Sequence, residues 1–137
     1  MIAVFDTNTL ISSFFWNGAP AQLLGLARGG ACQVASCETQ FKELFDVLQR
    51  PYFEKRREFL GLSSAEIVRG FSRFALTVTP VPLPRPVCRD VKDDFVLACA
   101  LAAKAAMIVS GDNDLLVLQS FEGVPIVTAA QAIVMLR

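Results

Sequence analysis

The 137-residue chain contains no histidine. This absence excludes reactions that need an imidazole, such as those of Ser–His–Asp and Cys–His hydrolases, histidine-bound zinc hydrolases and ribonucleases with paired histidines. The four cysteines form no C-x-x-C pair, and no histidine is available to complete a zinc site. We therefore expect buried free thiols rather than disulfides, as in a reducing compartment.

Long uncharged runs are also missing. The longest apolar stretch, residues 95–109, is interrupted by Lys104, whereas a membrane span needs ~20 apolar residues. The first apolar run ends at Asp6 and follows no basic segment, which is not the pattern of a secretory signal. The sequence therefore predicts a cytoplasmic protein without a membrane partner.

The chain has no excess of charge of either sign. Its 13 Lys and Arg residues balance 13 Asp and Glu residues, so the overall field predicts no partner, and any contact with nucleic acid must come from a local basic patch. The apolar fraction of 53% exceeds the average of roughly 45–50% for soluble domains. This surplus predicts apolar surface that is covered by another chain, either in a homodimer or by a different protein.

Short apolar strands alternate with helical patterns along a chain that is long enough for one domain. Strands are expected at residues 2–5, 32–35, 77–81, 107–110 and 125–127. Helices are expected at residues 20–28, 37–49, 52–60, 63–74, 93–106, 113–118 and 128–137. This alternation predicts an α/β fold with a mostly parallel sheet covered on both faces.

Five carboxylates stand near the ends of these strands and helices or, for Glu43, on the border of the apolar face of the helix at 37–49: Asp6, Glu43, Asp94, Asp112 and Asp114. Asp6 closes the first strand, and Asp112 follows the strand at 107–110. Ligands of parallel sheets bind beyond the carboxyl ends of the strands, so the acids could face one cleft. Grouped carboxylates are costly to bury unless a cation joins them, and a hard divalent ion is the natural candidate without imidazole.

Four motifs resemble those of one known family. They are Asp6-Thr7-Asn8-Thr9-Leu10-Ile11-Ser12, the segment 41–51 around Glu43, the segment 88–98 with Asp94 as the better match and Asp93 as the second, and Ser110-Gly111-Asp112-Asn113-Asp114. With these four motifs in this order, the chain is similar to PIN domains. It resembles in particular the PIN-family toxins of prokaryotic toxin–antitoxin systems, which are relatives of the VapC-type toxins. Val91 stands where that subgroup usually has proline.

The resemblance implies a single PIN domain over residues 1–137, with a three-layer α/β/α sandwich. It implies an Mg²⁺- or Mn²⁺-dependent endoribonuclease that hydrolyses RNA phosphodiester bonds and is neutralised by an antitoxin protein. The catalytic residues would be Asp6, Glu43, Asp94 and Asp112. The metal ligands would be Asp6, Asp94, Asp112 and Asp114, around one or two ions.

Neutral polar and basic residues add to this predicted site. Thr7, Asn8 and Ser110 lie near the same strand ends and could orient a carboxylate or a water molecule. The densest basic cluster consists of Arg50, Lys55, Arg56 and Arg57. This cluster could contact RNA phosphates without reading sequence, or it could be a solvated helix face. The aromatic residues at 14–16 could be core or a surface for a partner helix.

Other interpretations remain open. Asp6, Asp94 and Asp112 could simply cap helices or turns. A haloacid-dehalogenase-like phosphatase also uses an aspartate after its first strand, but it needs a second one two residues later, where this chain has Asn8. A PIN-like module that binds RNA or a protein without cutting is a further alternative.

Overall fold

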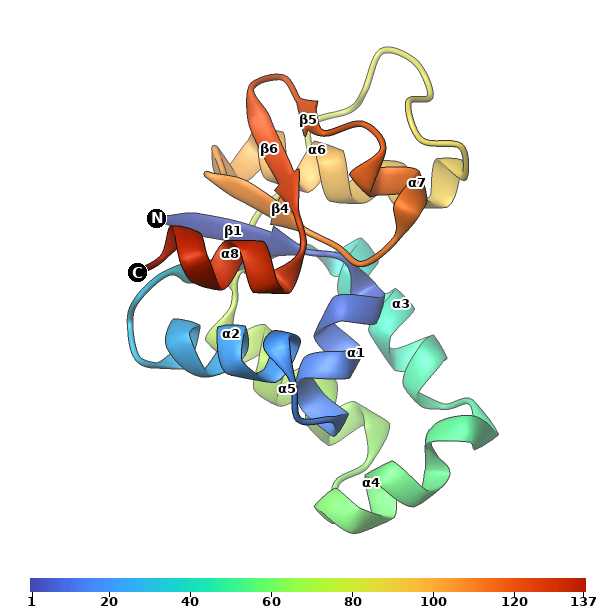
Figure 1. Ribbon diagram of the computed structural model, residues 1–137. Coiled ribbons are helices and arrows are strands. Elements are labelled where there is room, and N and C mark those ends of the chain that lie inside the picture. Colours follow the sequence, from blue (N-terminus) through green and yellow to red (C-terminus); the bar gives the residue numbers. More distant parts are fainter.

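The structure is a computed structural model that describes residues 1–137. Its centre is a six-stranded sheet with the order β3-β2-β1-β4-β6-β5, in which only β5 runs antiparallel to its neighbour (Figure 1). The strands are β1 (Ile2–Phe5), β2 (Gln33–Ser36), β3 (Leu76–Thr77), β4 (Met107–Val109), β5 (Ser120–Phe121) and β6 (Val124–Val127). Two central strands, β1 and β4, therefore end side by side.

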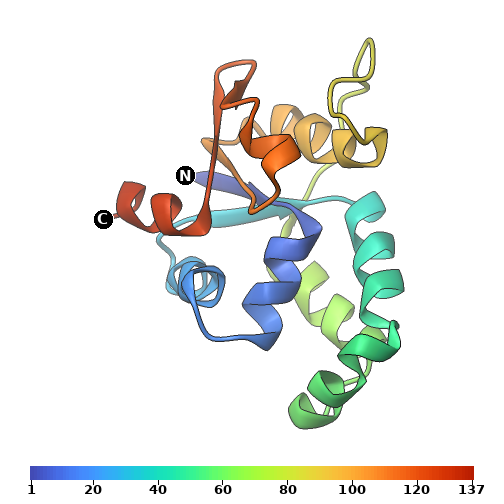
Figure 2. The same ribbon diagram turned by 45° about the vertical axis from the view of Figure 1, so that its right-hand side comes forward.

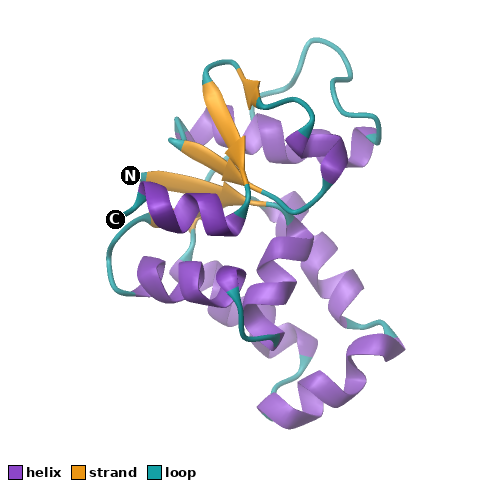
Figure 3. Ribbon diagram, viewed as in Figure 1, coloured by secondary structure: helices purple, strands orange, loops and turns teal.

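Eight α-helices connect and cover these strands (Figure 3). They are α1 (Thr7–Phe15), α2 (Ala19–Arg28), α3 (Glu38–Leu48), α4 (Glu54–Leu60), α5 (Ser64–Phe74), α6 (Asp94–Ala103), α7 (Asn113–Leu116) and α8 (Ala129–Met135). Two 3₁₀ turns, Pro51–Phe53 and Val91–Asp93, precede α4 and α6. None of these helices is both long and apolar enough to cross a lipid bilayer.

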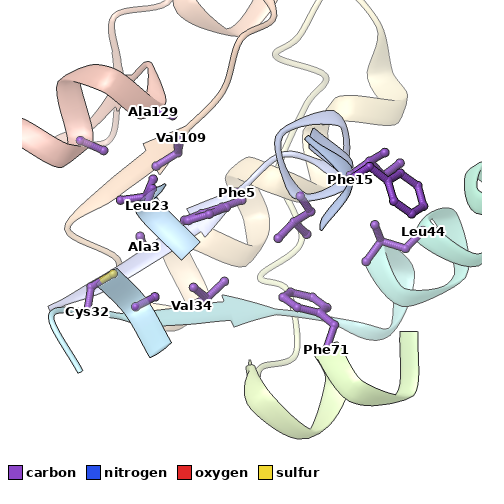
Figure 4. Close-up of a cluster of buried hydrophobic side chains, with 14 of the residues drawn as sticks. Ala3, Phe5, Phe15, Leu23, Cys32, Val34, Leu44, Phe71, Val109 and Ala129 are labelled. Atoms are coloured by element: carbon purple, nitrogen blue, oxygen red, sulfur yellow. The ribbon is translucent and has the colours of Figure 1, made fainter. Parts of the chain in front are cut away.

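Successive side chains of β1 point to opposite faces of the sheet, and each face has its own core. Ala3 and Phe5 belong to a cluster with residues of α1, α2, α3, α5 and α8, part of which is drawn in Figure 4. Val4 lies in a second cluster with residues of α6 on the opposite face. This arrangement confirms the predicted α/β/α layers. Figure 2 shows α4 farthest from the sheet, beyond α3 and α5.

Most predicted elements are present, with shifts at their ends. Helix α1 was not expected, because residues 7–15 show no polar face that would mark an amphipathic helix. The antiparallel strand β5 was not expected either. Of the strand expected at 77–81, only Thr77 lies in a strand, as the second residue of β3. Helix α6 stops earlier than expected, where Lys104 adopts a left-handed φ of 53°. All four cysteines are buried and free, as expected.

Capping residues fix the starts of two helices. Ser63 accepts a hydrogen bond from the Glu66 N–H and Glu66 accepts one from the Ser63 N–H, which is the predicted capping box of α5. Thr128 and Gln131 form the same reciprocal pair at the start of α8. The residues at N-cap, N1, N2 and N3 are therefore placed equivalently in the two helices.

Candidate active site

Four carboxylates from separate parts of the chain line one small cavity at the carboxyl edge of β1 and β4: Asp6, Glu43, Asp93 and Asp112. Thr7, Asn8, Phe95 and Val96 complete its lining. The cavity has a volume of about 30 Å³, which leaves room for a small ion or one or two water molecules. We call it the acidic cavity.

Asp6 joins the sheet to the first helix without an intervening loop. Its backbone N–H donates to the carbonyl of Val109 at 2.9 Å, which ties it to the end of β4. One carboxylate oxygen accepts the N–H of Thr9 at 2.8 Å and so caps α1. The other accepts the hydroxyl of Ser110. Asp6 is therefore fixed on three sides, with only 7% of its surface exposed.

Ser110 links two of the acids. Besides donating to Asp6, its hydroxyl oxygen accepts the backbone N–H of Asp112 at 2.9 Å. One oxygen of the Asp112 carboxylate accepts the N–H of Asp114 at 2.9 Å, which caps α7. Asp114 itself is absent from the lining of the acidic cavity. The expected role of Asp114 as a metal ligand stays a prediction, without support from the lining of the cavity.

Glu43 reaches the acidic cavity from α3. The hydroxyl of Thr7 donates to its carboxylate at 3.1 Å, which connects the first turn of α1 to α3. Burial raises the pKa of Glu43, the Thr7 hydrogen bond partly offsets that effect, and the nearby Asp6 raises it further. Arg50 acts in the opposite direction and is the one cation that influences Glu43.

The structure places the two adjacent aspartates differently. Asp93 lines the acidic cavity, whereas Asp94 does not. The Asp94 carboxylate accepts the N–H groups of Val87 at 3.0 Å and Cys88 at 2.7 Å, so it holds the end of the proline-rich segment. Partial burial raises the pKa of Asp94, but these hydrogen bonds outweigh it and keep the pKa below its usual value. Asp93 therefore shares the acidic cavity with the other three acids, and the catalytic and metal-binding role expected of Asp94 stays a prediction that this placement does not support.

Helical periodicity does not separate the two aspartates. The third and fourth positions after Asp93 are Val96 and Leu97, those after Asp94 are Leu97 and Ala98, and all of them are buried. Helix α6 is buried on most of its surface, so its sequence shows no single inward face that would favour Asp93. The motif resemblance alone ranked Asp94 first.

Like charges dominate the surroundings of Asp93. Its pKa is raised from 3.8 to about 6, first by burial and then by the negative charges of Asp112, Asp90, Glu43 and Asp6. The hydrogen bonds that reach the other three acids come from hydroxyl and backbone N–H groups rather than from lysine or arginine. Their mutual repulsion is the electrostatic condition under which a bound cation is stabilising.

The donor set suits a hydrated Mg²⁺ or Mn²⁺ ion. No three of the acidic or thiol side chains form a closed metal-binding group as they stand. Mg²⁺ does not need one, because it retains several waters and takes only one or two protein carboxylates directly. The acidic cavity offers only oxygen ligands, and its outer carboxylates could act through water.

Two members of the predicted basic cluster have structural partners. The Arg56 guanidinium stacks 4.9 Å from the centre of the Trp16 ring and donates to the carbonyl of Phe15 at 3.3 Å. Arg57 donates to the carbonyls of Leu48 and Arg50. These contacts hold α4 against α1 and α3. Arg50 and Lys55 remain exposed, and of the two only Arg50 influences Glu43.

Comparison with known proteins gives one match, to a protein family. No curated protein sequence and no solved structure matches the chain. A family model described as PIN domain matches residues 3–114, which include all four acids of the cavity. Since this match covers well over half of the sequence, the chain belongs to the PIN domain family, whose members are generally nucleases.

Proposed function

We propose that this protein is an Mg²⁺- or Mn²⁺-dependent endoribonuclease. The observation that carries the proposal is the acidic cavity itself, where Asp6, Glu43, Asp93 and Asp112 converge from four parts of the chain. In this proposal Asp93 takes the role that the sequence suggested for Asp94. A bound divalent ion would polarise the phosphate and lower the pKa of a coordinated water.

The protein's own groups supply position and proton transfer. Asp6 and Asp112 are the proposed metal ligands, and Ser110 holds them at a fixed separation. Without histidine, we assign to a carboxylate the proton that water loses as it attacks phosphorus; the leaving oxygen takes up that proton, or one from solvent, when its bond to phosphorus breaks. Asp93 and Glu43 suit that task, because their raised pKa values bring them nearer to neutral pH.

The test is cleavage of single-stranded and structured RNA by purified protein in Mg²⁺, in Mn²⁺ and in EDTA. The matched variant is Asp6→Asn, which keeps an N-cap residue for α1 while removing one negative charge. We expect metal-dependent cleavage by the wild type and loss of at least ~100-fold in the variant. RNA binding without any metal-dependent cleavage would instead favour the non-catalytic module.

The residue two positions after Asp6 separates this proposal from a phosphatase. A haloacid-dehalogenase-like enzyme would need a second carboxylate there, and Asn8 supplies a neutral amide. Asn8 is exposed and lines the acidic cavity beside Asp6. An assay with a small phosphomonoester provides the control, and turnover of that compound would contradict the nuclease assignment.

We further propose that the nuclease is the toxin of a toxin–antitoxin pair. The support is the resemblance of its four motifs to that subgroup and the apolar side chains left exposed on α4 and α5, such as Leu60 and Phe74. These side chains are available to an antitoxin or to a second copy of the chain. Induced expression should arrest growth, and Asp93→Asn should abolish the arrest; arrest by that variant would contradict the proposal.

A further inference from the structure

A second, larger pocket adjoins the acidic cavity and has no role in the chemistry proposed above. Its volume is about 490 Å³, within the usual range for small-molecule sites. Asn8 and Asp112 line both spaces, so the two lie next to each other. The pocket is walled by the starts of α1, α2 and α8 and by the segment that follows β4, and α2 packs against α8 (Figure 1).

The charge of this pocket argues against a phosphate. Among its eleven lining residues Asp112 is the only charged one, and none is basic. The N–H groups at the start of α8 are partly used by the Thr128–Gln131 capping box. A phosphate group there would meet a carboxylate without a compensating cation. The pocket therefore suits a neutral group.

Its polar side chains are placed to form hydrogen bonds. Thr9 is 6% exposed; its backbone N–H donates to Asp6, and its side-chain hydroxyl makes no hydrogen bond with the protein. No fully buried side-chain nitrogen or oxygen lacks a partner in this structure, so the unpartnered Thr9 hydroxyl must be accessible, and it lines this pocket. The hydroxyl of Ser12 and the amide of Asn8 line the pocket too, also without protein partners.

The remaining walls are small and apolar. Ala19 and Pro20 of α2 and Ala129 and Ala130 of α8 line it. Apolar side chains against the faces of a base, together with hydrogen bonds to its edge, are the means by which proteins hold a base that has left its stack. Next to the phosphate that is cut, an RNA chain presents a ribose and a base, both neutral.

We propose that this pocket binds the base of a nucleotide adjacent to the cleaved phosphate, so that the protein cuts single-stranded RNA with a base preference at that position. This inference rests on the proposed nuclease function for the location of the cleaved bond. The Thr9, Ser12 and Asn8 side chains would contact the edge of the base, and Ala130 would lie at its face.

The experiment compares two probes of equal length. One is a single-stranded RNA of mixed sequence, and the other is a ribose–phosphate chain that lacks bases. Binding is measured by fluorescence anisotropy in Ca²⁺, which binds oxygen ligands, and cleavage is measured separately in Mn²⁺. Ala130→Leu fills the pocket. Its control is Ala65→Leu, because both alanines are exposed N2 residues of helices with a capping box, and Ala65 lies outside the pocket.

We expect the wild type to bind the base-containing RNA about tenfold more tightly than the base-free chain, Ala65→Leu to keep this difference and Ala130→Leu to lose it. Thr9→Val, which preserves shape, should reduce the difference about fivefold through the lost hydrogen bond. Equal binding of both probes by the wild type, or an unchanged difference in Ala130→Leu, would overturn the base pocket. Discriminating binding with no cleavage in Mn²⁺ would overturn the nuclease function and leave the pocket standing.

Discussion

Asp93 and Asp94 are consecutive in the chain, yet their carboxylates do opposite things. Asp93 lines the acidic cavity among other negative charges, and Asp94 accepts two backbone hydrogen bonds outside it. We therefore expect the charge of Asp93 to weaken the metal-free fold and the charge of Asp94 to strengthen it. Isosteric substitutions at these neighbours should separate activity from stability.

The Asp93→Asn variant should lose activity and gain stability. Removing this carboxylate should lower RNA cleavage by ~100-fold or more, because a charged group in the acidic cavity is lost. The same change relieves repulsion from Asp112, so the melting temperature in EDTA should rise. Cleavage at the wild-type rate by a clean preparation would show that Asp93 has no part in the reaction.

The Asp94→Asn variant should show the reverse pattern. An asparagine side chain has one acceptor oxygen in place of two, so either the Val87 or the Cys88 N–H loses its partner. We expect a loss of about 1–2 kcal/mol in the free energy of unfolding, measured with urea. Cleavage at a temperature well below the melting point should persist. An Asp94→Asn variant that is as stable as the wild type but inactive would show that Asp94 is a catalytic residue.

Stability in metal-free buffer should depend on pH through Asp93. Its pKa is about 6 in the folded protein against 3.8 for the unperturbed group, so between these values the folded state binds more protons. Stability therefore falls as pH rises from about 4 to about 6 and is lowest above that range. Because Asp93 is partly solvated, we expect about 1 kcal/mol, measured as the difference between wild type and Asp93→Asn. A difference that is constant with pH would contradict this account.

Mn²⁺ or Mg²⁺ should raise the melting temperature by binding the folded state. An ion at ten times its dissociation constant would add about 1.4 kcal/mol, or roughly 4 °C for a domain of this size. Sodium chloride at equal ionic strength controls for screening of the repulsion. Asp112→Asn should respond less than the wild type. An equal shift in both proteins would place the ion elsewhere.

Arg50 should contribute to RNA binding through phosphate contact. It is exposed and influences Glu43, so a phosphate at the mouth of the acidic cavity lies within its field. Arg50→Gln should weaken binding of all sequences equally and reduce the salt dependence by about one counterion. Arg69→Gln, an exposed arginine on α5, serves as the control. Equal effects of the two substitutions on RNA binding would show that Arg50 contributes no more than any other exposed arginine.

Local chemistry explains why much of the fold was predictable. The apolar run before Asp6, the capping box at Ser63 and the amphipathic pattern around Leu44 each specify their element within a few residues. The sequence pattern did not predict helix α1, because most of its residues are buried, including the polar Thr7 and Ser13. No polar face therefore distinguishes it. The two-residue strand β3 depends on its pairing with β2 rather than on its own sequence.

The site was predictable where a strand end defines it and less so elsewhere. Asp6 and Asp112 follow directly from the ends of β1 and β4. The choice between Asp93 and Asp94 depends on which carboxylate the backbone of Val87 and Cys88 captures, a contact that no local pattern encodes. Arg56 likewise looked free in sequence, because its partners Phe15 and Trp16 lie about forty residues away.

The proline-rich segment before α6 is the part of the chain near the acidic cavity whose length can change most easily. Asp6, Asp112 and Glu43 are anchored to the sheet and to α3, so changes around them disturb the core. Asp93 ends the 3₁₀ turn Val91–Asp93, which follows a segment without helix or strand that Asp94 fastens at its end. Insertions or deletions in that segment would shift Asp93 and Asp94 and leave the order of the strands unchanged. In the proposed nuclease, changes of loop length could therefore alter the metal preference or the reaction rate without a new fold.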